Sequence, residues 1–172
     1  MRKLALVVLI ALVAGTLLAA SAEAQQSTAT ASANATATMI TAIAITRTAH
    51  MNFGDVVTGT STGTVVLSAA ASPTRSATGG TKLGNSTVVS SAIYTVTGEG
   101  SSTYSITLPG SPVTLTSGGN SMTLSTFTSS PSGTGTLSSG SQTLYVGATL
   151  NVGATQASGI YTGSFDVTVA YN

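Results

Sequence analysis

The strongest constraint on the fold is a strict two-residue alternation of side chains near the end of the chain. From Tyr161 to Tyr171 the odd-numbered positions are apolar or glycine, and the even-numbered positions between them carry Thr, Ser, Asp and Ala. Residues 144–152 have apolar side chains with the same period. A period of two predicts β-strands with one buried face, because the residues of a helix repeat every 3.6 positions.

Composition extends this prediction to the rest of the chain. The 172 residues include 25 serines and 32 threonines, and only 5% of the residues are charged. A content of 42% hydrophobic residues, rich in valine, argues against disorder, and Thr and Val favour strands. Further strands separated by glycine-containing turns are predicted at residues 39–46, 63–68, 88–97, 104–108, 113–115 and 122–127. We therefore expect an all-β sandwich, with a polar loop at 69–84 and a turn at 133–135.

The chain divides into three predicted parts. Arg2 and Lys3 precede an apolar run at 4–20, and Ala22-Glu23-Ala24 follows it, which is the order of a secretory signal peptide over residues 1–24. The alternative is an uncleaved membrane anchor, which is less favoured because no stop-transfer charges follow the run. Residues 25–38 are small and polar and predict a flexible extension, and residues 39–172 form the sandwich domain.

The residue types that carry catalysis are scarce. His50 is the only histidine, and the chain has no cysteine and no tryptophan. The carboxylates after residue 24 are Asp55, Glu99 and Asp166, which are far apart in sequence and sit in turns or on a polar strand face. We predict no catalytic residue, no metal site and no cofactor, so the protein is not an enzyme. A hydrolase that uses these carboxylates is the last-ranked alternative.

The charge balance also limits the partners. The three carboxylates are matched by Arg47, Arg75 and Lys82, so the exported chain has a net charge near zero. Without a basic patch, we predict no nucleic-acid binding, and contact with a membrane only during export.

The two ends of the exported chain point to assembly. Edge strands normally carry charges or prolines that prevent pairing, yet the final predicted strand has only Asp166. At the other end, an extension of small residues leads into an alternating strand. An extended segment that adds to the sheet of another subunit is a donor strand. The period of two gives two candidate sets of inward side chains: Ala33, Ala35 and Ala37 in the extension, or Met39, Ile43 and Ile45 in the first strand.

The final strand also resembles a known element. Tyr171 is the penultimate residue and Gly159 is the fourteenth from the end, as in the chaperone-recognition strand of chaperone–usher pilus subunits. More widely, the chain resembles a family of secreted bacterial domains of unknown function, family 4402, grouped with Mat/Ecp-type fimbrial subunits and spore-coat-protein-U-like pilins. The segments that carry the resemblance are 53–54, 63–65, 96–98, 104–109, 144–150 and 159–172.

This resemblance implies an immunoglobulin-like sandwich that lacks one strand. It would be exported through the periplasm, capped there by a periplasmic chaperone and polymerised by an outer-membrane usher, with copies of itself or other pilus subunits, at the cell surface. The strand that pairs first with the chaperone and later lines the acceptor groove would contain Gly159, Tyr161, Phe165, Val167, Val169 and Tyr171. Many such pilins have a disulfide, which this chain lacks.

The alternative to assembly is a self-contained secreted sandwich that acts as an adhesin or a carbohydrate-binding module. In that case the first strand closes its own sheet and the protein is a stable monomer. The candidate platforms for stacking a sugar are Tyr94, Tyr104, Tyr145 and Tyr161.

Overall fold

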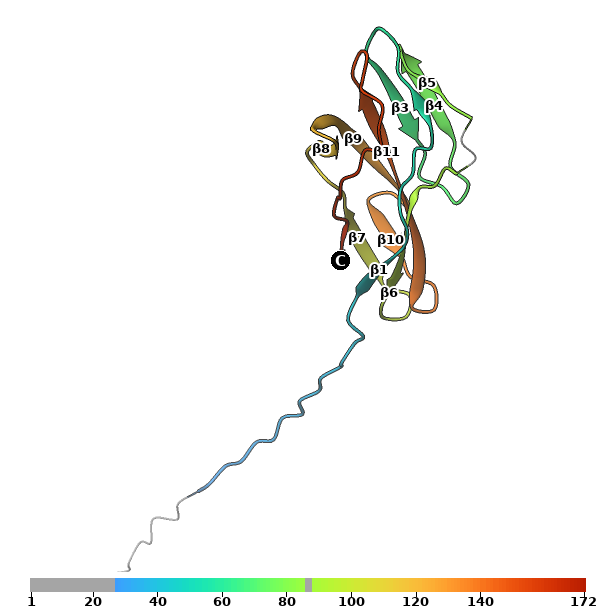
Figure 1. Ribbon diagram of the computed structural model, residues 1–172. Coiled ribbons are helices and arrows are strands. Elements are labelled where there is room, and N and C mark those ends of the chain that lie inside the picture. The colour runs from blue at the N-terminus through green and yellow to red at the C-terminus, as the bar shows by residue number, and fades with distance from the viewer. Residues whose placement is uncertain (1–26, 86–87) are drawn as a thin grey trace, which may run out of the picture. The chain divides into compact units, whose positions relative to one another are not determined.

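The computed structural model describes residues 27–85 and 88–172 (Figure 1). The predicted signal peptide lies outside the described residues. The chain forms two units, Met1–Thr38 and Met39–Asn172. Of the first unit, residues 27–38 are described, and they are exposed and contain no strand or helix. All the strands belong to the second unit.

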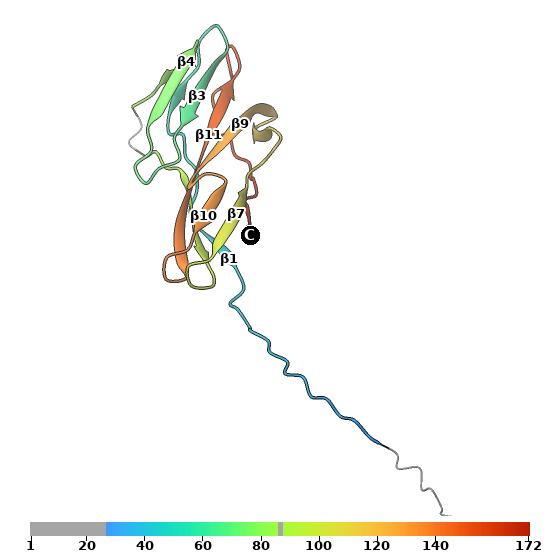
Figure 2. The same cartoon turned by 180° about the vertical axis from the view of Figure 1, so that it is seen from behind.

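The second unit is built from antiparallel strands, and the predicted all-β sandwich is confirmed. The main sheet has the order β1-β6-β11-β3-β4, with β9 paired to β11 and β8 paired to β9. A second sheet has the order β10-β7-β12, and β2 pairs with β5 (Figures 1 and 2). The strands are β1 (Ala44–Ala49), β2 (Val56–Val57), β3 (Gly63–Leu67), β4 (Arg75–Gly79), β5 (Lys82–Leu83), β6 (Ala92–Thr97), β7 (Thr103–Thr107), β8 (Val113–Ser117), β9 (Asn120–Ser130), β10 (Thr134–Thr136), β11 (Ser141–Val152) and β12 (Thr168–Tyr171). No helix long and apolar enough to cross a membrane occurs in the described ranges.

Strand β11 is the longest and joins the parts of the main sheet. Along one edge it pairs first with β6, through residues 141–146, and then with β3, through residues 148–152. Its other edge pairs with β9. Gly147 lies between the two partners, where a side chain would collide with the carbonyl oxygen of Leu67 as the chain leaves β3. The predicted alternation is confirmed, since all the inward side chains are buried: Leu144, Val146, Ala148, Leu150 and Val152.

The core consists of two clusters of buried side chains. The first lies on the inner face of β6 and the first half of β11, and contains Ala92, Tyr94, Val96, Tyr104, Leu137, Leu144 and Val146. The second lies on β3, β9 and the second half of β11, and contains Val65, Leu124, Leu150 and Val152. Half-buried Met51, Phe127 and Phe165 pack against both clusters. These three side chains therefore join the two halves of the core.

Strands of polar residues were missed by the sequence analysis. The predicted polar loop at 69–84 contains β4 and β5, and the predicted turn at 133–135 overlaps β10. β4 is an edge strand whose residues Ser76 and Thr78 face solvent, so it pairs with β3 without an apolar pattern of its own. Such strands are recognisable only from their partners.

The predicted first strand, residues 39–46, instead begins at Ala44. Ala44 pairs with Thr97, which is the last residue of β6. Beyond Thr97 the partner chain turns through residues 98–101, so residues 39–43 have no strand beside them. A strand ends where its ladder of hydrogen bonds ends.

The predicted final strand, residues 160–171, is a strand only over Thr168–Tyr171. Thr168 pairs with Thr107, the last residue of β7. Before Thr168 the chain keeps its alternation, because Phe165 and Val167 are half-buried and their neighbours are exposed. Residues 160–167 form no hydrogen-bonded ladder with another strand, apart from a single bridge between Thr162 and Thr116. The sequence pattern of a strand therefore extends well beyond the pairing that this chain supplies.

Gly147→Ala should destabilise the domain by about 2 kcal/mol, because the added methyl group overlaps the backbone of β3 at the junction in β11. Gly110→Ala is the matched control, since a side chain at Gly110 meets nothing within 4 Å. Urea unfolding of both variants measures the difference. Equal unfolding midpoints for the two variants would contradict this account of the junction.

Candidate functional site

Several of the described strands pair along one edge only, and two of these, β1 and β12, approach each other. In the part of the chain that the structure describes, β1 pairs only with β6 and β12 pairs only with β7. Residues of β1 and β12 are in contact, yet no hydrogen-bonded ladder joins the two strands. The free edges of both strands therefore offer N–H and C=O groups to an additional strand.

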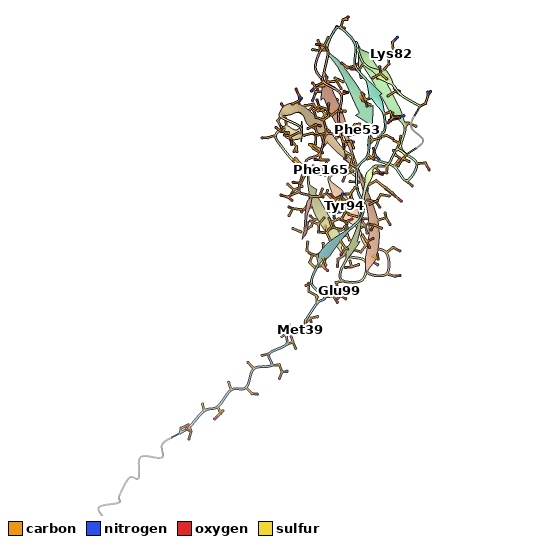
Figure 3. All side chains as sticks on the ribbon, viewed as in Figure 1. Met39, Phe53, Lys82, Tyr94, Glu99 and Phe165 are labelled. Atoms are coloured by element: carbon orange, nitrogen blue, oxygen red, sulfur yellow. The ribbon has the colours of Figure 1, made fainter. Side chains whose placement is uncertain are left out.

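A groove lies along the segments that follow β1 and precede β12. Its volume is about 1010 Å³. Residues 50–58, which follow β1, form one wall, and residues 156–165, which precede β12, form the other. Side chains of the second core cluster, including Leu124, Leu150 and Val152, form the floor. Figure 3 labels Phe53, Tyr94 and Phe165, all of which line the groove.

The segment from Phe165 to the end of β12 directs one apolar face toward the interior. The ring of Phe165 packs against Phe127 with 5.0 Å between ring centroids and 50° between ring planes. Val167, Val169 and Tyr171 continue the same face and pack against the first core cluster. All four inward side chains remain half-buried. The interior beside this segment is therefore only partly covered by the chain itself.

Opposite charges stand near the groove beside Tyr94. Burial raises the pKa of the Tyr94 hydroxyl, the nearby Arg47 guanidinium lowers it, and the Asp166 carboxylate raises it. Arg47 belongs to β1 and Asp166 to the wall before β12, and both side chains are exposed. His50 and Asp55 also line the groove. Within residues 27–85 and 88–172, no three His, Asp or Glu side chains gather where they could hold a metal ion.

Beyond the groove, the end of β12 is joined to the chain before β1 by a ring of hydrogen bonds, which we call the Thr41 clamp. The Tyr171 hydroxyl donates to the Thr41 carbonyl at 2.7 Å and accepts from the Glu99 backbone N–H at 2.6 Å. The Thr41 N–H donates to the Glu99 carboxylate at 2.9 Å, and this bond lowers the pKa of Glu99. Gly98 makes room for the clamp, because a side chain there would collide with the Tyr171 hydroxyl.

A comparison with protein-family models places this architecture in a family. Residues 43–171 match the model described as Domain of unknown function (DUF4402). The chain belongs to the DUF4402 family. No curated protein and no solved structure matches it significantly. The resemblance to this family that the sequence predicts is therefore confirmed.

The match gives the DUF4402 domain a boundary at the clamp. It begins at Ile43, so it includes β1, β12 and both walls of the groove. It leaves out the extension and Thr41. The matched region thus contains the whole of the strand-forming sandwich, and the extension lies before it.

The structure separates the candidate donor residues into two groups. Ile43 and Ile45 pack against the first core cluster of their own domain. Met39 is 93% exposed, and the extension residues Ala33, Ala35 and Ala37 are also exposed. Their proposed role as a donor stays a prediction.

The candidate groove residues fall along one wall. Gly159, Tyr161 and Phe165 line the groove, and Val167, Val169 and Tyr171 continue toward the clamp. Their role in chaperone recognition stays a prediction. Of the tyrosines considered as sugar platforms, Tyr94 and Tyr104 are buried in the core.

Sequence reasoning missed the first wall of the groove and the clamp. Met51 and Phe53 are apolar residues on either side of Asn52, a pattern too short to mark a site, and Glu99 resembles an ordinary turn residue between Gly98 and Gly100. The available signal was that Glu99 is the only glutamate after residue 24. A lone carboxylate between glycines, in a chain with so few charges, is a candidate for a specific contact.

The clamp should weaken in acid. The Glu99 carboxylate has a lowered pKa in the folded protein, so its contribution to stability is present above the ordinary glutamate pKa of about 4.3 and is lost as the pH falls through the lowered value. In an NMR titration, the Thr41 amide shift should move together with the Glu99 side chain, with a midpoint below that ordinary value. In Glu99→Gln the Thr41 amide should show no such transition. A Thr41 amide that does not follow Glu99 in the native chain would show that the contact does not form.

Proposed function

We propose that this protein is a non-enzymatic structural subunit of a bacterial surface fimbria or a related extracellular coat, and that subunits join by donating a strand. One observation carries the proposal. The alternating segment that ends in β12 has an apolar face over the core, a free edge toward β1 and an open groove beside it. This is the shape of a sandwich to which a strand can be added.

The proposed occupant is the segment 27–40 of a second copy, because Thr41 is held to its own domain. Its 14 residues span about 46 Å when extended, at about 3.3 Å per residue. The acceptor segment 163–171 spans about 30 Å at the same rise, so the donor is long enough to pair with all of it. Residues 27–38 are exposed and form no structure of their own. They are therefore available for pairing with another chain.

The donor side chains alternate in the way that a groove requires. Ala33, Ala35, Ala37 and Met39 would enter the groove, and Asn34, Thr36 and Thr38 would face solvent. Burying Met39, which is 93% exposed, contributes about 2 kcal/mol. Ile43 and Ile45 already pack in their own core, so we place the donor before them.

The open edge also explains why a chaperone would be needed. A free groove in a domain with few charges exposes both apolar side chains and unpaired backbone groups. A periplasmic chaperone that pairs with residues 159–171 would cover them during export, before an outer-membrane usher exchanges it for the next subunit. In this proposal the assembled product is at the cell surface, as in Mat/Ecp-type fimbriae and spore-coat-protein-U-like pilins.

The competing proposal is a monomeric adhesin or carbohydrate-binding module whose first strand closes its own sheet. The arrangement of the edges argues against it, because β1 lies beside β12 without forming a ladder with it. The burial of Tyr94 and Tyr104 also removes two of its four candidate sugar platforms.

Glutamates at alternate positions of the extension test donation directly. Ala35→Glu with Ala37→Glu places two charges on the face that enters the groove and should abolish multimers, since burying an unpaired carboxylate is very costly. Thr36→Glu with Thr38→Glu adds the same charge to the outward face and should leave multimers intact. The readout is the SDS-resistant ladder formed by the secreted chain, together with negative-stain images of the producing cells.

The two double variants have equal length and equal charge, so they separate strand insertion from general effects of charge. Equal assembly by both variants would exclude insertion of this segment as a strand. Loss of assembly in both would show that repulsion, and not the register of side chains, controls the multimer.

A further inference from the structure

The Thr41 clamp occupies both backbone polar groups of one residue. The Thr41 N–H is bound by the Glu99 carboxylate and the Thr41 carbonyl by the Tyr171 hydroxyl. Two residues later, Ile43 packs against the core. The chain is therefore held to the sandwich at Thr41, shortly before β1 and beside the end of β12.

A hairpin that used Thr41 as a hydrogen-bonded partner would break this clamp. For the extension to enter its own groove, the chain would have to reverse before β1 and run back between β1 and β12. With a two-residue turn at 39–40, Thr38 and Thr41 would exchange two backbone hydrogen bonds. The Thr41 N–H needed for that pair is already donated to Glu99, and the Thr41 carbonyl already accepts one hydrogen bond from Tyr171.

The sequence around the clamp also lacks turn residues. Residues 35–43 contain no Gly, Pro, Asn or Asp. Thr36, Thr38 and Ile40 are β-branched and disfavour the positive φ angles that tight hairpin turns require. A reversal between residues 35 and 40 is therefore also unfavourable.

We propose that the Thr41 clamp, together with the turn-poor segment 35–43, keeps the chain from filling its own groove, so that the extension can enter only a second copy. This inference rests on the proposed function, because it concerns the same groove and the same donor. It adds the reason why closure is between chains: the extension is tied to its own domain at Thr41, beside the end of β12.

Peptide binding distinguishes the two arrangements. A labelled peptide with the sequence of residues 27–40 is titrated into the native exported chain and into Ala35→Glu with Ala37→Glu, each diluted until light scattering reports monomers. An extension that reached its own groove would act at a roughly millimolar effective concentration and exclude the peptide. We expect the native monomer to bind the peptide as tightly as the glutamate variant, because both grooves are empty.

Two further variants isolate the clamp. Met39→Asn with Ile40→Gly supplies a hairpin turn and leaves the clamp intact, and this variant should still bind the peptide. Adding Tyr171→Phe and Glu99→Ala to it releases Thr41, and peptide affinity should then fall by at least about tenfold as the groove fills from within. Thermal unfolding checks that this variant is folded: its midpoint should be higher than that of the clamp-intact variant and independent of protein concentration.

Each outcome bears on one proposal. A native monomer that excludes the peptide, while the glutamate variant binds it, would overturn the inference and leave strand donation intact. Loss of peptide binding in the turn variant with an intact clamp would show that the clamp is not the barrier. A peptide that binds neither the native chain nor the glutamate variant would instead refute donation by residues 27–40.

Discussion

The ladder of β11 is the interaction on which the other parts of the sandwich depend. One edge of this strand carries β6 and then β3, and the other edge carries β9. Its inward side chains contribute to both core clusters. The change of partner requires the close approach of two backbones at Gly147. Because both halves of the domain are attached to one strand, the fold does not need the edge at β12 to be closed in order to have a core.

Because the core does not depend on a partner for β12, the outer edge of β12 can remain unpaired. Most soluble proteins protect such an edge with charges, whereas this chain places Thr and Ser on its outward positions and has few charged residues. Uncharged hydroxyl side chains accept a neighbouring strand without repulsion. The same composition that leaves the protein poor in catalytic groups therefore suits it to pairing with another chain.

The sequence predicted those features that depend on a single strand, namely which of its side chains face the core. The buried face of β11 and the inward face of residues 165–171 follow from alternation alone. The strands β4 and β5 did not, because β4 is mostly small and polar and β5 has only two residues. Neither has a pattern of its own, and each exists through pairing, with β3 and β2 respectively. The extent of β1 and β12 was overestimated because a ladder ends where its partner ends, at Thr97 and Thr107.

The site was predictable in part for the same reason. One wall of the groove lies in the alternating final segment, and the sequence identified it. The other wall, around Phe53, follows an irregular path, and the clamp joins Thr41, Glu99 and Tyr171 from three distant parts of the chain. Contacts of this kind leave no periodic signal in a single sequence.

The clamp has a mechanical consequence. Any tension on the extension enters the domain at Thr41, before it reaches the ladder of β1. From Thr41 the load divides among the covalent chain, the turn that contains Glu99 and the end of β12. The Tyr171 hydroxyl thus transmits part of a force on the N-terminal extension to β12, the last strand of the chain.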